Sequence, residues 1–323
     1  MHLINGLISI MGFIESAMKS VISIQELVHD LKELGVHEGD KLNVKVSLKS
    51  IGAIEGGADG LISALLIAVG ASGTIFGDCF LVGHPLKNVK KEPLKYLTDD
   101  NSVSYAGAFV NAMAKDIRSK RSPHPIQKFV AIGADADWVL EHNVESRPYS
   151  VLFKLIENGG KNLKIGDPAK VYGVGTTHCA IESLGWRQLM PKRAVTYKDD
   201  NGDIKLFLHN WPSGCMNAFD KIGIAYNNKV NWRNEGKVGN AYAMLSDMRA
   251  TYDAEVEAAT ANPNMLRCDD PNCVRCRIDW KEHHNNRFFQ ILKYLVTFKF
   301  RSAYICLEHL LFYSYEPNDS YNK

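Results

Sequence analysis

The order of segments between residues 41 and 76 constrains the fold more than any other feature of the sequence. Residues 41–47 (KLNVKVS) alternate apolar and polar side chains, as a strand does. A turn that contains Gly52, Gly56 and Gly57 follows, then the apolar stretch ADGLISALLIAVG, then a short second strand at residues 73–76. Strand, glycine turn, helix and strand make a βαβ unit, which predicts an α/β fold.

The glycine turn has two interpretations. Backbone N–H groups at the start of a helix, together with the positive end of the helix dipole, can bind an anion such as a pyrophosphate. The turn contains neither a GxGxxG motif nor the lysine of a Walker motif. Spacing alone therefore leaves open whether it cradles a phosphate or is a plain turn.

Composition excludes several classes of protein. A content of 46% hydrophobic and 23% charged residues is typical of a globular chain, not of a disordered or collagen-like one. The 38 Lys and Arg against 36 Asp and Glu give a formal net charge of +2, and they do not cluster as in a protein that binds nucleic acid. The seven cysteines are an odd number, and such a set is no disulfide framework for a chain of this size. We therefore expect reduced thiols and a cytoplasmic protein.

The chain is expected to have three parts: an N-terminal extension (1–22), a main domain (23–260) and a C-terminal extension (261–323). The first part is apolar, but Glu15 and Lys19 interrupt it well before the ~20 residues that a spanning helix needs. It also lacks the basic start and the cleavage site of an export signal. We expect no membrane span.

The main domain continues with alternating helices and strands. Ser23 and Glu26 predict a capping box at the start of its first helix. Thr176 and Thr177 are expected N-caps of a later helix. Further helices are expected at 107–117, 138–142 and 149–158, strands at 129–133 and 162–166, and a hairpin at 193–197 and 204–208.

Seven segments in this order resemble the aminoglycoside 3-N-acetyltransferase family of coenzyme A-dependent acyltransferases. The segments are KVSLKSIGAIEGGADGLISALLIAVGASGT, YAGAFVNAM, RSPHP with VAIG, RPYSVLFKLIENGGKNLKIG, GTTHCAIES, KLFLHNW and EGKVGNAYAMLSDMRATYDAEV. The resemblance runs from about residue 24 to residue 260. It implies a three-layer α/β/α fold, an acyl-CoA donor and an amino sugar acceptor.

The resemblance also implies which residues bind the donor. The start of the helix at Ala58 would take the pyrophosphate, Thr74 would lie near the pantetheine arm, and a Gly-Ala pair would line the acyl end. The full set of implied donor residues is Ser47, Gly56, Gly57, Ala58, Thr74, Gly107 and Ala108. The sequence departs from the family pattern at Asp78, Cys79 and Lys128, and in the spacing around His178. These departures put the predicted identity of the acceptor in doubt more than the predicted binding of the donor.

The chemistry of amine acylation requires a base. A protonated amine cannot attack a thioester, and imidazole is the side chain whose pKa lies near neutral pH. His178 matches the family histidine and is the expected base, with Glu182 one helical turn away to orient the ring. His124 in the His-Pro element is either a second catalytic group or a structural histidine. Spacing alone would also fit a surface pair of His178 and Glu182, with no catalytic role.

Cysteines support two further hypotheses. A covalent acyl-cysteine at Cys79 or Cys179 is disfavoured, because Cys179 is adjacent to His178 and neighbours on a helix point about 100° apart. In the C-terminal extension, three thiolates and one imidazole can form a tetrahedral zinc site, with free thiols in a loop as the alternative. The proposed ligands are Cys268, Cys273, Cys276 and His283. The aromatic stretch at 288–317 that follows either covers the core or forms a homodimer contact.

The basic residues of certain segments suggest the chemical type of the acceptor. The segments expected on the acceptor side are basic, and the residues that would bind an anion are Arg121, Lys128 and Arg147. We therefore expect an N-acyltransferase that acts on a nucleotide-linked amino sugar, of the kind used to build surface polysaccharide. An aminoglycoside acetyltransferase is the first alternative, and a non-catalytic, zinc-stapled interaction protein is the second.

Overall fold

The computed structural model describes most of the main domain and parts of the C-terminal extension. The described residues are 21–166, 175–186, 189–190, 193–209, 215–222, 233–273, 276–277, 287–297, 299–304, 307 and 314–315.

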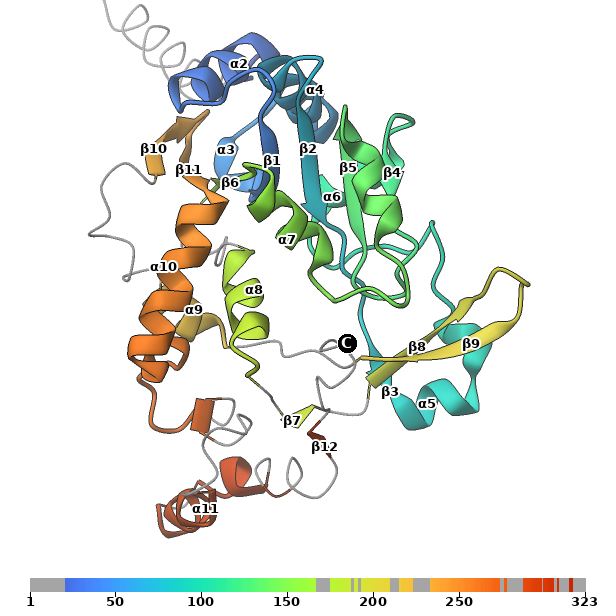
Figure 1. The fold of residues 1–323 in the computed structure, drawn as a ribbon, viewed down its shortest axis with the longest axis vertical. Coiled ribbons are helices and arrows are strands. Elements are labelled where there is room, and N and C mark those ends of the chain that lie inside the picture. The colour runs from blue at the N-terminus through green and yellow to red at the C-terminus, as the bar shows by residue number, and fades with distance from the viewer. Residues whose placement is uncertain are drawn as a thin grey trace, which may run out of the picture.

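A mixed sheet of seven strands forms the centre of the described structure (Figure 1). Its three central strands, β6, β1 and β2, run parallel, and the pairs toward both edges are antiparallel. The strand order is β10 (Arg233–Val238), β11 (Ala241–Asp247), β6 (Lys161–Ile165), β1 (Lys41–Val46), β2 (Thr74–Asp78), β5 (Phe129–Gly133) and β4 (Lys120–Arg121).

The predicted βαβ unit is confirmed. Strands β1 and β2 are parallel neighbours, and helix α4 (Gly57–Val69) connects them. The short helix α3 (Leu48–Ile51) precedes the turn into α4. Gly56 caps α4 with a left-handed backbone, φ 68°, which side chains with a Cβ rarely adopt. The glycine turn thus directs the start of α4 toward the edge where β1 ends.

Helices cover both faces of the sheet, which confirms the three-layer α/β/α prediction. One apolar core joins the sheet to α2 (Ile24–Glu33), α4 and α6 (Ala108–Lys115). A second core lies on the other face, where the sheet meets η2 (Ala136–Glu141), α7 (Ser150–Glu157), α8 (Thr176–Ser183) and α10 (Met248–Ala261). The segment expected as a helix at 138–142 is part of the 3₁₀ helix η2.

Local signals in the sequence fix several boundaries. The Ser23 hydroxyl accepts from the Glu26 N–H at 3.2 Å, and the Glu26 carboxylate accepts from the Ser23 N–H at 2.7 Å, so the capping box is confirmed. The predicted hairpin is also present as β8 (Arg193–Lys198) and β9 (Ile204–Leu208). It forms a small second sheet with β3 (His84–Pro85), beside α5 (Leu86–Lys91) and η1 (Pro93–Tyr96).

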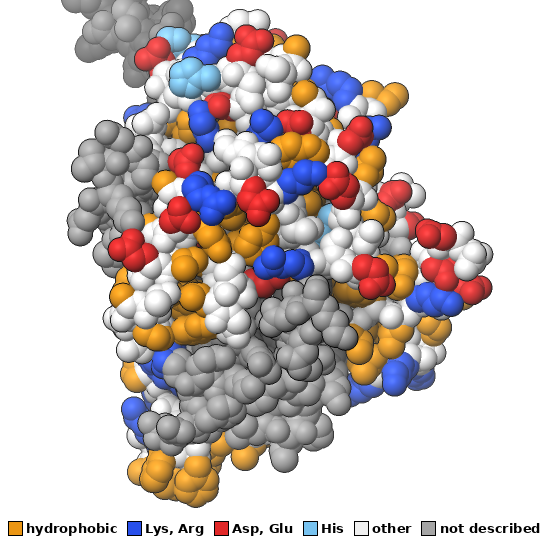
Figure 2. Space-filling view, in the orientation of Figure 1, with side chains coloured by type: hydrophobic (Ala, Val, Ile, Leu, Met, Phe, Trp, Pro, Cys, Tyr) orange, Lys and Arg blue, Asp and Glu red, His pale blue; other side chains and the backbone are white. Residues whose placement is uncertain are grey.

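Short elements from residues 189–315 lie below the main sheet in Figure 1. They are α9 (Met216–Ile222), η4 (Pro263–Leu266), α11 (Arg287–Val296) and the strand pair β7 (Leu189–Met190) and β12 (Ser314–Tyr315). In α11, Tyr294 is buried against Ala303, whereas Phe288, Phe289 and Val296 are exposed. Figure 2 shows hydrophobic side chains at the lower end of the molecule, where Figure 1 places α11. Among the helices of the described ranges, none has the length and apolar character needed to span a bilayer.

Candidate active site

Two charged side chains meet where the parallel strands end. Lys45 lies near the end of β1 and Asp78 is the last residue of β2. The Lys45 Nζ is 3.2 Å from Oδ2 of Asp78, and the Asp78 side chain is only 9% exposed. The other carboxylate oxygen, Oδ1, has no hydrogen-bond partner in the described part of the chain. Asp78 thus leaves one buried acceptor at this edge of the sheet.

Helix α8 contains His178 and lies near the same edge of the main sheet. Thr176 and Thr177 are not its N-caps, because the cap position is Gly175 and both threonines lie inside the helix. The Thr177 hydroxyl instead donates to the buried carboxylate of Glu255 in α10, at 2.5 Å. Thr177 therefore helps to fix α8 against α10 from inside the core.

His178 lies between two aromatic rings. It stacks on Tyr149 with ring centroids 4.7 Å apart and meets Phe219 of α9 edge-on at 4.9 Å. Burial, together with the smaller effect of the nearby Lys45 charge, lowers the pKa of His178 to about 3. The ring is therefore neutral at physiological pH. Its Nδ1 has no hydrogen-bond partner among the described residues and is free to accept a proton.

Glu182 is on the same helix but is paired elsewhere. Its Oε1 accepts from the Nε of Arg147 at 2.8 Å, and the Arg147 guanidinium lies over the ring of Phe153 at 4.1 Å. Burial raises the pKa of Glu182, while the hydrogen bond and charge of Arg147 oppose the shift. Its Oε2 has no partner in the described structure. No hydrogen bond between Glu182 and His178 is present among these residues, so the orienting role expected for Glu182 stays a prediction.

Tyr149 is central to this cluster. It is buried, and burial raises its pKa well above the usual value, with further contributions from Tyr105, Glu182 and Asp78. The His178 ring stacks on this tyrosine, and the charges of Asp78 and Glu182 act on its pKa. We call Asp78, Tyr149, His178 and Glu182 the carboxylate–histidine cluster. It holds three buried polar atoms without partners among the described residues: Asp78 Oδ1, His178 Nδ1 and Glu182 Oε2.

The structure brings several of the expected donor residues together. Ala58 and Ala108, at the starts of α4 and α6, line one surface hollow of about 760 Å³. At Gly57 and Gly107, which precede them, a Cβ would meet open space. Ser47 lies at the end of β1, with its hydroxyl 2.9 Å from that of Ser50. Two helix starts therefore face one hollow, an arrangement suited to anionic groups.

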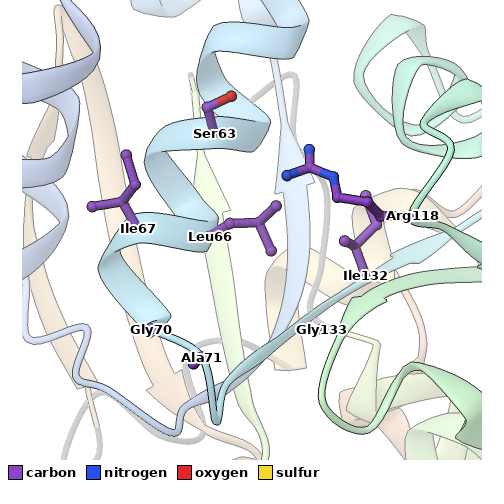
Figure 3. Close-up of a pocket in the computed structure, with 8 residues that line it drawn as sticks. All are labelled: Ser63, Leu66, Ile67, Gly70, Ala71, Arg118, Ile132 and Gly133. Atoms are coloured by element: carbon purple, nitrogen blue, oxygen red, sulfur yellow. The ribbon is translucent and has the colours of Figure 1, made fainter.

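A second hollow of about 680 Å³ adjoins α4 further along (Figure 3). Arg118 lines both hollows, and its guanidinium is paired with Asp116. The other residues shown around it are Ser63, Leu66, Ile67, Gly70, Ala71, Ile132 and Gly133. The two hollows therefore follow α4 from its start to its end.

Thr74 lies at the start of β2, at the end of the strand opposite the cluster. It is the first residue of β2, whereas Asp78 at the other end of the strand reaches the cluster. Thr74 is fully buried, and its hydroxyl accepts from the Asp135 N–H at 2.8 Å. Thr74 and Asp78 are thus about 13 Å apart, because they are four residues apart in one strand. The expected contact of Thr74 with the pantetheine arm stays a prediction.

His124 is held in the core, away from the cluster. Its Nδ1 accepts from the backbone N–H groups of Ile126 and Gln127, at 3.2 and 2.9 Å, and its ring stacks on His142 at 4.7 Å. Burial lowers its pKa well below the usual value. The ring is only 1% exposed. These contacts fit the structural alternative for His124, since they close the turn after Pro125.

The basic side chains expected to bind an anionic acceptor have partners within the protein. The Lys128 Nζ is buried, donates to the Ser122 carbonyl at 3.1 Å and lies 3.6 Å from a carboxylate oxygen of Asp100. The Arg121 guanidinium donates to the carbonyl groups of Asp100 and Ser102. Arg147 is paired with Glu182, as described above. The first two therefore hold the loop at 99–102, and the third holds α8.

The three cysteines predicted as zinc ligands lie close together, and a fourth cysteine, not the predicted histidine, is described beside them. Cys268, Cys273 and Cys276 lie beside Cys215, which precedes α9. His283 is outside the described residues. Cys215 was not predicted as a member, because it lies 58 residues before Cys273 and belongs to no recognisable spacing motif.

Comparison with known proteins agrees with this architecture. The family described as "Aminoglycoside 3-N-acetyltransferase" matches residues 44–260. The chain belongs to this family. The aminoglycoside N(3)-acetyltransferase III of Salmonella is 32% identical over 67% of this chain and 84% of its own length. The family is one of acetyl-CoA-dependent N-acetyltransferases, which confirms the resemblance and the predicted enzyme class.

Solved structures show the same fold. A variant of the acetyltransferase AAC(3)-IVa in complex with gentamicin has a TM-score of 0.67, is 24% identical, and covers 80% of this chain and 96% of its own. AAC-IIIb, solved as a binary complex with CoA, has a TM-score of 0.60, is 21% identical, and covers 75% of this chain and 97% of its own.

Proposed function

We propose that this protein transfers the acetyl group of acetyl-CoA to an amine of an aminoglycoside-type acceptor, with His178 as general base. The observation that carries the proposal is the set of unpaired acceptor atoms in the carboxylate–histidine cluster. Buried acceptors without partners are costly, and a ligand that supplies donors relieves that cost.

A polycationic amino sugar suits these atoms better than a nucleotide-linked one. Asp78 and Glu182 each use one oxygen for a basic partner and leave the other free. An ammonium or hydroxyl group of the acceptor can donate to these oxygens. A diphosphate brings further acceptors and negative charge, which the free oxygens repel. Arg121 and Lys128, the residues once expected to bind it, are engaged with the loop at 99–102.

The names of the relatives also favour this acceptor. They are aminoglycoside N(3)-acetyltransferases, and one solved neighbour holds gentamicin. The expectation of a nucleotide-linked sugar from surface polysaccharide synthesis gains no support from them. We therefore prefer what the sequence offered as its first alternative.

The proposed reaction is a direct transfer. The acceptor nitrogen bonds to the thioester carbonyl carbon while the neutral His178 ring takes the proton that the amine loses. The C–S bond then breaks, and the departing CoA thiolate receives the proton from the imidazolium. Glu182, one helical turn from His178, is the carboxylate proposed to stabilise that imidazolium. The products are an amide and free CoA.

The donor would bind along α4 and α6. The starts of both helices offer N–H groups and positive dipole ends at the hollow lined by Ala58 and Ala108, where the pyrophosphate would lie. Lys115 and Arg118 border the same hollow, but so do Asp59 and Asp116, so the helix starts and not a surplus of basic side chains would bind the pyrophosphate.

The decisive experiment measures CoA release with acetyl-CoA and a matched panel of acceptors. Gentamicin- and kanamycin-type compounds should be acetylated, and nucleotide-linked amino sugars should not. Asp78→Asn and Glu182→Gln should raise KM for the polycationic acceptor more than KM for acetyl-CoA. His29→Ala is the control variant, since His29 is exposed on α2.

Two outcomes would overturn the proposal. Turnover of nucleotide sugars without turnover of aminoglycosides would reinstate an anionic acceptor. Calorimetry that detects no binding of acetyl-CoA would instead support a non-catalytic protein that has kept the fold.

A further inference from the structure

Four cysteines from two distant segments meet beside the carboxylate–histidine cluster. The sulfur atoms of Cys215, Cys268, Cys273 and Cys276 all lie within 4.8 Å of one another. Cys268 and Cys276 are buried, and the other two are half-buried. They pack with Ala218 of α9 into a small core of their own. We call them the four-cysteine cluster.

The spacing of the sulfurs fits a metal better than disulfides. The Sγ atoms of Cys215 and Cys273 are 3.8 Å apart. A disulfide would bring two sulfurs to about 2.05 Å. Four sulfurs bound to one zinc ion at about 2.3 Å, at the corners of a tetrahedron, are about 3.8 Å apart. The cluster therefore has the dimensions of a tetrahedral thiolate site.

The surrounding backbone supports bound thiolates. The N–H of Cys268 points at the sulfur of Cys276, with N and S 3.4 Å apart. Such an N–H group partly balances the negative charge of a coordinating thiolate, as outer hydrogen bonds do around many metal ligands. Arg277 adds a positive side chain beside the cluster, where its guanidinium donates to the Cys268 carbonyl at 2.7 Å.

We propose that the four-cysteine cluster binds one zinc ion in a closed structural site, with Cys215 as the fourth ligand in place of His283. Four thiolates in a tetrahedron select zinc or iron among the common metals, and closed sites with only protein ligands are structural. The ion joins the segment before α9 to the segment after η4. Lys221 of α9 and Asp269 form an ion pair across the same junction.

The site also supports one wall of the candidate active site, a consequence that rests on the proposed function. Cys215 directly precedes α9, and α9 carries Phe219, whose ring meets His178 edge-on. Phe219 further packs with Ile181 and Leu266, from α8 and η4. A metal that fixes the start of α9 therefore fixes the ring against which His178 rests.

The test is metal analysis of the full-length protein. The protein is purified without chelators from cells grown with added zinc. We expect about one equivalent of zinc per chain. Cys215→Ser should lower the zinc content to below about one tenth of an equivalent and lower Tm by about 5 °C or more. Cys79→Ser, which changes a buried cysteine outside the cluster, should keep the metal.

Two further measurements do not depend on the variants. Cobalt exchanged into the wild-type protein should give the charge-transfer and d–d absorption of a tetrahedral thiolate site. A strong chelator should lower the Tm of wild-type protein, and added zinc should restore it. None of these readouts requires activity, so a failed acetylation assay leaves them valid.

Three results would overturn the assignment. Metal-free wild-type protein whose Tm does not respond to zinc or chelator would exclude the site. Iron in place of zinc would show that the metal is wrong. Disulfides among the four cysteines, detected by mass spectrometry of peptides, would replace the metal with covalent bonds.

Discussion

The ion pair between Arg147 and Glu182 provides a direct test of how α8 is held. Arg147→Met keeps the aliphatic length of the side chain over Phe153 but removes the donor to Glu182. The Glu182 side chain is 8% exposed and the Arg147 side chain 43% exposed. Removing one partner of a fully buried pair costs about 3–5 kcal/mol, but solvent around Arg147 screens this pair. We therefore expect a loss of about 1–2 kcal/mol in the free energy of unfolding at pH 7.5.

The loss should depend on pH in one direction. Burial already raises the pKa of Glu182, and the variant removes the hydrogen bond and charge of Arg147 that oppose this shift. A folded-state pKa above the unfolded value means that the folded variant gains stability as pH falls and Glu182 takes up a proton. The difference between wild type and Arg147→Met should therefore shrink from pH 8 to pH 5.

Urea denaturation of a double-mutant cycle is the assay. Glu182→Gln should recover part of the stability lost in Arg147→Met, because the double variant has no buried carboxylate without a partner. Lys154→Met is the matched control on α7, since Lys154 pairs with the 67% exposed Glu141 side chain and should change stability by less than about 0.5 kcal/mol. Equal losses in Arg147→Met and Lys154→Met, or a loss independent of pH, would refute the reasoning.

Four more outcomes can be checked on single variants or the wild type. His178→Ala should lower kcat by about 10²–10⁴-fold while the affinity for acetyl-CoA measured by calorimetry stays unchanged; near-normal turnover would remove His178 from the mechanism. Lys45→Met should raise the pKa of His178 above its value of about 3, seen in NMR titration of the ring, and an unchanged titration would mean that burial alone sets it. Gly60→Ala should cost about 1–3 kcal/mol in urea denaturation, because its Cβ would lie 1.8 Å from the Glu55 carbonyl oxygen, and a neutral result would show that the turn before α4 can move. Burial lowers the pKa of His142 from 6.5 to about 4, so this residue should contribute about 3 kcal/mol to a loss of wild-type stability between pH 6.5 and 4, where the unfolded chain binds a proton that the folded one does not. His124 and His178 should add to the loss in the same direction, and constant stability over this range would contradict the prediction.

Much of the fold followed from local sequence signals. The capping box of Ser23 and Glu26 needs only four residues, and the βαβ unit needs only neighbouring segments. The direction of β5 was not predictable, since an apolar run such as residues 129–133 reads the same in parallel and antiparallel strands. The N-cap of α8 was misassigned, because the hydroxyl of Thr177 has a partner in α10 that no local pattern reveals.

The candidate site was predictable in part. Resemblance pointed to His178, and the structure leaves its Nδ1 without a hydrogen-bond partner among the described residues. It did not reveal that Thr74 lies at the opposite end of β2 from Asp78, because alignment along the chain does not state which edge of the sheet a residue faces. Charge counting did not reveal the partners of Arg121 and Lys128, because net charge says nothing about intramolecular pairing. Cys215 required tertiary structure, since it is remote in sequence from the other three cysteines.

The pairing of β1 with β6 has a consequence for how the chain folds as it is made. Asn43 of β1 and Asn162 of β6 share a buried hydrogen bond although 119 residues separate them. Ribosomes add about 5–20 residues per second, so roughly 6–24 s pass between the synthesis of these two strands. β1, α4 and β2 can associate early, but the other side of β1 then exposes unpaired N–H and C=O groups to neighbouring chains. The middle strand of the finished sheet is thus an open edge on the nascent chain until β6 has left the ribosome.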